Sequence, residues 1–300
     1  MADPIDILVT GGAGQVGLEL LAAKWPARIR LHAPTRETLD LANPESIRRA
    51  FTERSWAAVI NSGAWTQVDK AEADSAAAFA VNALAPAVLA ELARDAKIPM
   101  VQVSTDYVFN GSGNTPYAED APVGPVSVYG ASKLSGELAV QSIQPRSVIL
   151  RTAWVLSPHR TNFLKTMLRL AGDRPNLRVV DDQRGNPTSA RDIAAAIQRI
   201  ALKLIDDPDA PVGTYHFVNA GQTTWAGLAR QILLFSAGSG GPSAEVEGIA
   251  TDQYPTPARR PANSVLATTR LTRDYGIVPR PWQDAVAEII AELHTEGPPA

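Results

Sequence analysis

The feature that most constrains this chain is a glycine-rich turn near its N-terminus. A short apolar run over residues 5–10 leads directly into residues 11–17, which read Gly-Gly-Ala-Gly-Gln-Val-Gly. Glycine lets such a turn close and lets the backbone approach a pyrophosphate, while the free N–H groups of the following helix favour negative charge. A glycine-rich turn alone is a weak signal, but its place between a first strand and a first helix predicts a dinucleotide site.

Short apolar runs alternate with amphipathic stretches through the first half of the chain. Predicted strands cover residues 5–10, 29–32, 57–61, 100–104 and 147–151. Helices are predicted between them, for example over 43–54, with Asn43 as N-cap and Pro44 at the first helical position, and over 75–96, where Pro86 should kink the helix or separate two helices. This alternation predicts an α/β fold with a doubly wound, Rossmann-like parallel sheet.

The second half of the chain has a different pattern. After about residue 155, predicted helices over 162–171, 189–205 and 225–236 are separated by polar, proline-rich joints. We therefore expect residues 1–155 to form the dinucleotide-binding domain and residues 156–300 a smaller, mixed substrate lobe, with the two lobes interleaved. Residues 236–243, Ser-Ala-Gly-Ser-Gly-Gly-Pro-Ser, are too poor in apolar side chains to pack and predict a mobile loop.

Composition excludes several classes of function. The net charge is -3, so the surface offers no broad positive field for nucleic acid or anionic lipid. There is no cysteine and the four histidines are scattered, which argues against thiol chemistry and zinc. We find no basic leader and no uninterrupted apolar stretch of roughly 18 residues, so we expect a cytoplasmic protein without a membrane span.

The end of the second predicted strand bears on cofactor choice. An acid at this position usually binds the ribose hydroxyls of NAD, whereas an arginine can bind the 2′-phosphate of NADP. Residues 32–36, His-Ala-Pro-Thr-Arg, contain no acid and one arginine. They predict NADPH, with NADH possible, unless Arg36 merely lies on a solvated loop.

Tyr129 and Lys133 are four residues apart and thus neighbours on one helical face. An ammonium beside a phenol favours the phenolate, so we expect Lys133 to lower the pKa of Tyr129 from about 10. The pair follows a predicted strand that ends in Ser104-Thr105-Asp106. A hydroxyl at that strand end would complete a pair of donors for a carbonyl oxygen.

Together these features resemble the extended short-chain dehydrogenase/reductase superfamily and, within it, the dTDP-4-dehydrorhamnose reductases. The closer resemblance spans almost the whole chain, through residues 68–72, 103–109, 116–117, 128–137, 150–154, 162–167, 182–188 and 254–261. It implies NAD(P)H-dependent reduction of the C4 ketone of dTDP-4-dehydro-L-rhamnose to dTDP-L-rhamnose.

The resemblance also implies roles for individual residues. Tyr129 would donate a proton to the C4 oxygen, Thr105 would bond the same oxygen, and Lys133 would hold the nicotinamide ribose. The cofactor would contact Gly11, Gly14, Gln15, Val16, Gly17, Arg36, Asp40, Leu41, Ala64, Trp65, Thr66, Tyr129 and Lys133. The substrate would contact Thr105, Asp106, Trp154, Asn162, Lys165, Arg259 and Arg260. Two alternatives stay open: Trp154 as an ordinary buried aromatic, and either arginine of the pair bound to a carboxylate of its own lobe.

One position departs from the family pattern. Some members join as dimers through a metal held by glutamates, and Glu19 matches the first of these. The helix start after Pro187-Thr188 has Arg191 where the resemblance leads us to expect a carboxylate. Because a cation there would repel the metal, we expect no metal requirement, and a monomer or a homodimer.

Rival functions are distinguishable in principle. A nucleotide-sugar epimerase would keep its cofactor and consume no external hydride, whereas a 4,6-dehydratase would need Glu directly after Thr105-Asp106, where this chain has Tyr107. A non-catalytic regulatory subunit would need no proton donor, yet the hydroxyls and the lysine are present.

Overall fold

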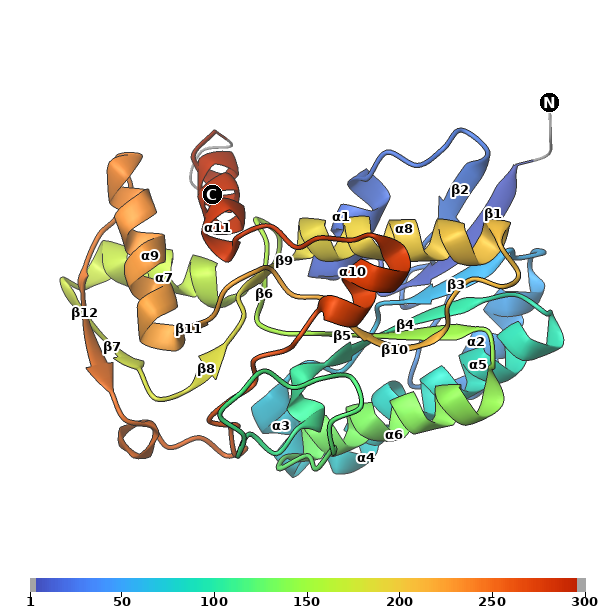
Figure 1. Ribbon diagram of the computed structural model, residues 1–300, viewed down its shortest axis with the longest axis horizontal. Helices are drawn as coiled ribbons and strands as arrows, with labels where there is room; N and C mark the ends of the chain where they lie inside the picture. The colour runs from blue at the N-terminus through green and yellow to red at the C-terminus, as the bar shows by residue number, and fades with distance from the viewer. Residues whose placement is uncertain (1–3, 296–300) are drawn as a thin grey trace.

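A six-stranded sheet in which all strands run parallel forms the centre of the larger lobe in the computed structural model, which describes residues 4–295 (Figure 1). The strand order is β10-β5-β4-β3-β1-β2. The strands are β1 (Ile5–Thr10), β2 (Ile29–His32), β3 (Ala58–Asn61), β4 (Met100–Thr105), β5 (Ser147–Thr152) and β10 (Gly213–His216). All five predicted strands are present, each with its ends within one residue of the prediction.

Helices cover both faces of this sheet. On one face lie α1 (Gln15–Ala22), α8 (Ala190–Asp206) and α10 (Thr269–Tyr275), and on the other α2 (Pro44–Thr52), α5 (Ala85–Asp95) and α6 (Val128–Ile143) (Figure 1). Side chains of β1 alternate between the two cores, because Ile7 and Val9 pack with the first set of helices and Leu8 with the second. The predicted doubly wound, Rossmann-like fold is thereby confirmed.

A smaller lobe of mixed structure has a core of its own. Its helices are α7 (Phe163–Asp173), α9 (Trp225–Gly238) and α11 (Trp282–Thr295). Three short strand pairs join them: β7 (Asn176–Val180) with β12 (Glu245–Ile249), β8 (Arg184–Gly185) with β11 (Thr223–Thr224), and β6 (Val155–Leu156) with β9 (Thr188–Ser189). Leu164, Leu228 and Val286 are buried together between the helices. The lobe lies to the left of the sheet in Figure 1.

The chain passes from the large lobe to the small lobe and back. Residues 190–216 supply α8 and the edge strand β10, so part of the second half of the chain belongs to the central sheet. The contact is a tight one, because Ile193 and Ile197 of α8 are fully buried against the sheet. Residue 155 therefore does not mark a boundary between the two lobes in space. The division into residues 1–155 and 156–300 stays a prediction.

The helical stretch after β3 is broken in the way that proline requires. Following α3 (Val68–Ala73), α4 (Ser75–Phe79) passes through a π-helical turn, η1 (Ala80–Leu84), into α5, which has Pro86 in its first turn. Residues 75–95 are long and apolar enough to cross a membrane by length and composition alone. In the fold, however, Ala85, Val88 and Leu89 pack in the core beneath the sheet.

The predicted loop over residues 236–243 is partly helical, which corrects the sequence-based expectation. Helix α9 continues to Gly238, and Ser236 is fully buried. The Ser236 hydroxyl donates to the Pro242 carbonyl at 2.8 Å, and the Gly241 amide donates to the Ser236 carbonyl at 2.8 Å. Small residues allow the chain to fold back closely on the helix end, so low hydrophobicity did not prevent packing here.

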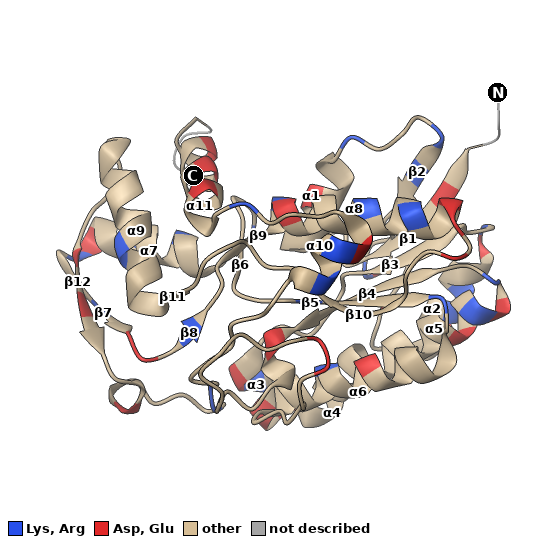
Figure 2. Cartoon of the chain, in the orientation of Figure 1, with Lys and Arg blue, Asp and Glu red and all other residues tan. Residues whose placement is uncertain are grey.

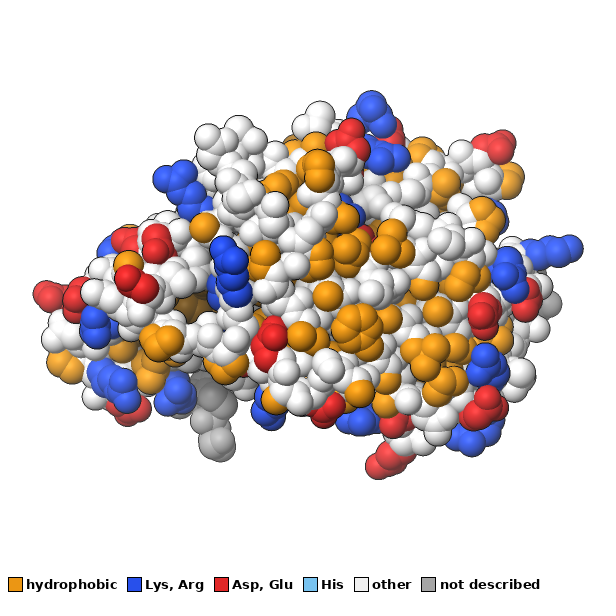
Figure 3. Space-filling model, turned by 90° about the horizontal axis from the view of Figure 1, so that it is seen from below, with side chains coloured by type: hydrophobic (Ala, Val, Ile, Leu, Met, Phe, Trp, Pro, Cys, Tyr) orange, Lys and Arg blue, Asp and Glu red, His pale blue; other side chains and the backbone are white. Residues whose placement is uncertain are grey.

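The outer face of the helices below the sheet is apolar (Figure 3). Phe79, Leu84 and Leu138 remain 37%, 49% and 54% exposed on α4, η1 and α6. Exposed apolar patches of this kind often mark contact surfaces. The expectation of a monomer or a homodimer stays a prediction.

A buried ion pair joins α6 to β5. Arg151 and Glu137 side chains are 5% and 1% exposed, and Arg151 Nη2 lies 2.7 Å from Glu137 Oε2. Removing one partner leaves an uncompensated buried charge, so we expect Glu137→Gln to lower the free energy of unfolding by about 3–5 kcal/mol. Urea unfolding measures the loss. Replacing both partners, as in Glu137→Leu with Arg151→Met, should recover most of it, and a double variant as unstable as the single one would contradict this explanation.

Candidate active site

Two backbone turns meet where β1 and β3 end, and the glycines there have no room for a side chain. Gly11 has φ 71°, and a Cβ on it would lie 2.5 Å from the Gly63 amide nitrogen. A Cβ on Gly17 would collide with the Gly11 carbonyl. Helix α1 begins after Gly14 with no side-chain cap, so its first N–H groups are available to a ligand. The turn therefore fits the pyrophosphate of a dinucleotide.

The residues predicted to contact the adenosine half follow β2. Gly12 lies against the Ala33 side chain, which places the glycine turn beside the end of that strand. Arg36 is 83% exposed, with its Nε 3.5 Å from Asp40 Oδ1. The Leu41 side chain occupies the space next to Gly63 where a Cβ would lie. The structure thus brings Arg36, Asp40 and Leu41 to the same edge of the sheet as the glycine turn.

The loop after β3 is held by a residue that sequence reasoning missed. Asn82, in the π-helical turn, is 1% exposed. Its Oδ1 accepts from the Trp65 amide at 2.8 Å, while its Nδ2 donates to the Trp65 carbonyl and to the Ser132 hydroxyl, both at 3.0 Å. One amide therefore fixes the segment of Ala64, Trp65 and Thr66 against α6. A polar residue in the middle of an apolar helix was the available signal.

Tyr129 and Thr105 come together at the carboxyl end of β4. Ser127 caps α6 by accepting from the Gly130 amide at 3.2 Å, and this start buries the Tyr129 side chain, which is 8% exposed. Burial raises the pKa of Tyr129 to about 12, with the Asp106 charge adding to the rise and a hydrogen bond to Thr105 opposing it. The phenol is therefore protonated at neutral pH, as a proton donor must be before reaction.

Lys133 does not act on the phenol in the way the spacing predicts. Its Nζ donates to the Val103 carbonyl of β4 at 2.8 Å. Burial lowers the pKa of Lys133 to about 8, against the opposing charge of Glu137. The expected lowering of the Tyr129 pKa is wrong for this conformation, because burial of the phenol outweighs other effects.

Asp106 completes the buried group at this strand end. Thr105 Oγ1 donates to Asp106 Oδ1 at 2.9 Å, whereas Asp106 Oδ2 is buried and has no hydrogen-bond partner within the described part of the chain. Burial raises the pKa of Asp106 to about 6, and the hydrogen bond from Thr105 acts against the rise. An unsatisfied acceptor beside Thr105 is suited to a ligand hydroxyl.

Trp154 stands at the junction of the lobes in a strained backbone conformation, with φ 44°. Its ring stacks on Trp225 with centroids 3.6 Å apart and an interplanar angle of 8°. Its edge lies over Gly185, where a side chain would clash. This packing fixes the indole rigidly, and contact of Trp154 with a sugar stays a prediction.

Two predicted substrate residues are engaged with other parts of the protein. Asn162 caps α7 through Oδ1, which accepts from the Lys165 amide at 3.1 Å, and its Nδ2 donates to Gln15 Oε1 at 2.9 Å. The Lys165 ammonium donates to the Pro158 carbonyl at 2.8 Å. The structure therefore brings Asn162 to the glycine turn through Gln15.

The two adjacent arginines differ in environment. Arg260 Nη2 lies 2.8 Å from Asp69 Oδ2 of α3, so this side chain pairs with a carboxylate of the other lobe. Arg259 is exposed and makes no ion pair with any residue between 4 and 295. Of the two, Arg259 has the guanidinium that is available for an anionic ligand.

Arg191 lies at the centre of a carboxylate cluster between α1, α8 and α11. Its guanidinium nitrogens are 3.2 Å from Glu19, 2.7 Å from Glu288 and 2.5 Å from Glu292. Figure 2 shows acidic residues on α1 and α11, the helices that Arg191 connects. Positive charge from the chain itself thus occupies the space among these acids.

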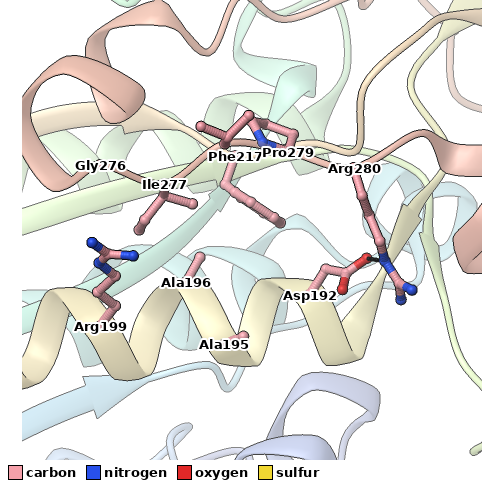
Figure 4. A pocket seen from close by; sticks show the side chains of 10 residues that line it. Asp192, Ala195, Ala196, Arg199, Phe217, Gly276, Ile277, Pro279 and Arg280 are labelled. Carbon is pink, nitrogen blue, oxygen red and sulfur yellow. Dashed lines mark hydrogen bonds and ion pairs between the residues drawn. The ribbon is translucent and has the colours of Figure 1, made fainter.

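A separate cleft of about 450 Å³ lies beside α8 (Figure 4). It is lined by Arg199, Ile277 and the Asp192–Arg280 ion pair, whose closest atoms are 2.8 Å apart. None of the predicted cofactor or substrate residues lines it. The cleft is therefore separate from the predicted site at the glycine turn and the end of β4.

The buried Lys133 ammonium has a consequence for stability. Its pKa is 10.5 in the unfolded chain and about 8 in the fold, so burial of the charge costs about 3 kcal/mol below pH 8. Between these values the unfolded chain binds the extra proton, and wild-type stability rises with pH. We expect Lys133→Met to raise the melting temperature at pH 7, with the gain over wild type shrinking from pH 8 to 10.5. The exposed Lys70→Met is the control, and a less stable Lys133 variant at pH 7 would refute the expectation.

Known proteins share both the sequence and the fold. The RmlD substrate binding domain family matches residues 5–295. A dTDP-4-dehydrorhamnose reductase of Sinorhizobium fredii (strain NBRC 101917 / NGR234) is 39% identical over 292 residues, which cover 97% of this chain and 98% of that protein. A crystal structure of a dTDP-4-dehydrorhamnose reductase from Clostridium acetobutylicum has a TM-score of 0.90 and 35% identity, covering 97% of this chain and 100% of the other. Another from Bacillus anthracis, in complex with NADP, has a TM-score of 0.88 and 29% identity, covering 96% and 99%. Because the match extends along nearly the full length of both chains, this protein belongs to the dTDP-4-dehydrorhamnose reductase family.

Proposed function

We propose that this protein reduces the C4 ketone of dTDP-4-dehydro-L-rhamnose to dTDP-L-rhamnose with NADPH. The observation that carries the proposal is the burial of two hydroxyl-bearing side chains, Thr105 and Tyr129, at the end of β4, on the edge of the sheet where the glycine turn lies. A reductase needs two such donors for the developing alkoxide. An NADP-bound relative with the same fold supports the choice of cofactor.

In the proposed reaction the reduced nicotinamide supplies a hydride, and the protein supplies the proton and the positioning. Tyr129 holds its proton at neutral pH, because burial raises its pKa to about 12. As negative charge develops on the substrate oxygen, the oxygen becomes basic enough to take that proton. The Thr105 hydroxyl turns its one hydrogen from Asp106 Oδ1 to the same oxygen when the substrate binds, and Lys133, one helical turn beyond Tyr129, contacts the nicotinamide ribose.

The substrate is proposed to lie across the junction of the lobes. Trp154, held by Trp225, borders the sugar, and the unsatisfied Asp106 oxygen accepts from a sugar hydroxyl. Arg259 supplies charge for the diphosphate, since Arg260 is paired with Asp69. Asn162 and Lys165 support this region from the start of α7.

Arg36 is proposed to contact the 2′-phosphate of NADPH, because it is exposed beside the end of β2 and only loosely paired with Asp40. We place the protein in the cytoplasm, where nucleotide sugars and reduced dinucleotides are available together. Its partners are then small molecules.

The direct test is NADPH oxidation with a panel of dTDP- and UDP-linked 4-keto-6-deoxy sugars. We expect one NADPH consumed per dTDP-sugar reduced. Tyr129→Phe should lower kcat by roughly 10²–10⁴-fold, because the proton donor is lost, while NADPH still binds. Turnover of the sugar without net NADPH consumption would indicate an epimerase. Unchanged function of Tyr129→Phe in cells would indicate a non-catalytic role.

We further propose that the protein needs no divalent metal, because the Arg191 guanidinium already lies among Glu19, Glu288 and Glu292 and binds all three. Activity should survive chelation with EDTA. Arg191→Gln should lower the melting temperature through repulsion among the carboxylates, and added Mg²⁺ should restore it, while wild type should not respond. Loss of wild-type activity on chelation, with recovery on adding Mg²⁺, would refute the proposal.

A further inference from the structure

Residues 157–162, here called the crossing segment, link the small lobe to the glycine turn. The segment lies between β6 and α7. Both of its ends bind one atom of the turn, because the Ser157 hydroxyl and the Asn162 amide each donate to Gln15 Oε1 at 2.9 Å. Ser157 is 1% exposed, so this anchoring lies inside the protein. The middle of the segment is therefore held over the turn.

Arg160, in the middle of the crossing segment, has an unusual backbone for a long side chain. Its φ is 56°, in the left-handed region that favours glycine. Its Nε donates to the Ala13 carbonyl of the glycine turn at 2.7 Å, although the residue itself is exposed. A glycine at this position would avoid the backbone strain, yet the chain has an arginine whose side chain reaches the glycine turn. This combination points to a role for the side chain.

The charge balance at the turn shows what that role is. A pyrophosphate carries two negative charges, yet residues 10–19 contain no lysine or arginine. Other basic groups of the crossing segment and the start of α7 are engaged, since Lys165 binds the Pro158 carbonyl and His159 Nε2 faces Glu19 Oε1 at 3.6 Å. Arg160 keeps two terminal nitrogens that make no ion pair with residues 4–295. The paired N–H groups of a guanidinium bind phosphate oxygens well, because they can donate two parallel hydrogen bonds.

We propose that Arg160 is a cofactor-binding residue whose guanidinium, held by the Ala13 carbonyl, binds the pyrophosphate of the dinucleotide from the side of the small lobe. The inference rests on the proposed use of a dinucleotide and adds a residue from the second half of the chain to its site. The pyrophosphate is common to NADPH and NADH. Loss of Arg160 should therefore weaken the binding of NADPH and of NADH by the same factor.

The experiment is equilibrium titration of each cofactor by nicotinamide fluorescence, without sugar substrate. We expect Arg160→Gly to raise the Kd of NADPH and of NADH by the same factor, about tenfold, and to flatten the dependence of Kd on salt. Without cofactor its melting temperature should be equal to or above that of wild type, because glycine adopts the left-handed conformation without strain. A gain in stability together with a loss of affinity would not arise from damage to the fold.

Two control variants sharpen the result. Arg36→Gln should weaken the binding of NADPH and leave the Kd of NADH unchanged, since Arg36 is assigned to the 2′-phosphate. Arg169→Gln, an exposed arginine on α7, removes the same charge elsewhere in the small lobe and should change neither Kd.

Three results for Arg160→Gly would overturn the inference. The Kd values could be unchanged, or only the binding of NADPH could be weaker. The third is a fall in melting temperature that accompanies the weaker binding. If wild type itself bound neither dinucleotide, the proposed function would fail as well. Normal wild-type binding with any of the three results would overturn the role of Arg160 only.

Discussion

The contact between two backbone turns at the carboxyl edge of the sheet is the constraint on which the rest of the structure depends. Gly11 approaches Gly63 so closely that Gly11 tolerates no Cβ, and Gly17 lets α1 start directly over the same place. The approach fixes the direction of α1 and leaves its first N–H groups without caps. Parallel pairing of β1 with β3 and of β3 with β4 brings the ends of these strands, which carry the polar groups of the site, to the same edge.

Features that depend on spacing within one element could be predicted from the sequence. The glycine turn, the Asn43 cap and the position of Tyr129 and Lys133 on one helix all follow from local chemistry, and the structure has them in place. Contacts between distant segments could not be predicted. Asn82 fixes the loop at Trp65, and β10 joins the sheet from the far half of the chain, because of packing that no local pattern encodes.

Electrostatics was harder to predict than position, for a physical reason. Spacing indicated that Lys133 and Tyr129 are neighbours, but the sign of a pKa shift depends on burial, which the sequence does not give. In the fold, burial outweighs charge at Tyr129, Asp106 and Lys133 alike. Each pKa is shifted in the direction that favours the neutral form. At neutral pH Tyr129 keeps its proton, Asp106 with a pKa of about 6 is still mostly ionised, and Lys133 holds its proton less tightly than an exposed lysine. Such a site costs stability and favours proton transfer.

The small lobe contacts helix α1 next to the glycine turn. The proposed binding of a dinucleotide at this turn therefore depends on how the two lobes are arranged. Gln15 accepts from both ends of the crossing segment, and Glu19 of the same helix pairs with Arg191 of α8. Helix α1 is therefore held at its first turn by the small lobe and one turn later by the α8–α11 cluster. A displacement of the small lobe would have to break the contacts of Gln15 with the crossing segment and those of Arg191 with Glu288 and Glu292 on α11.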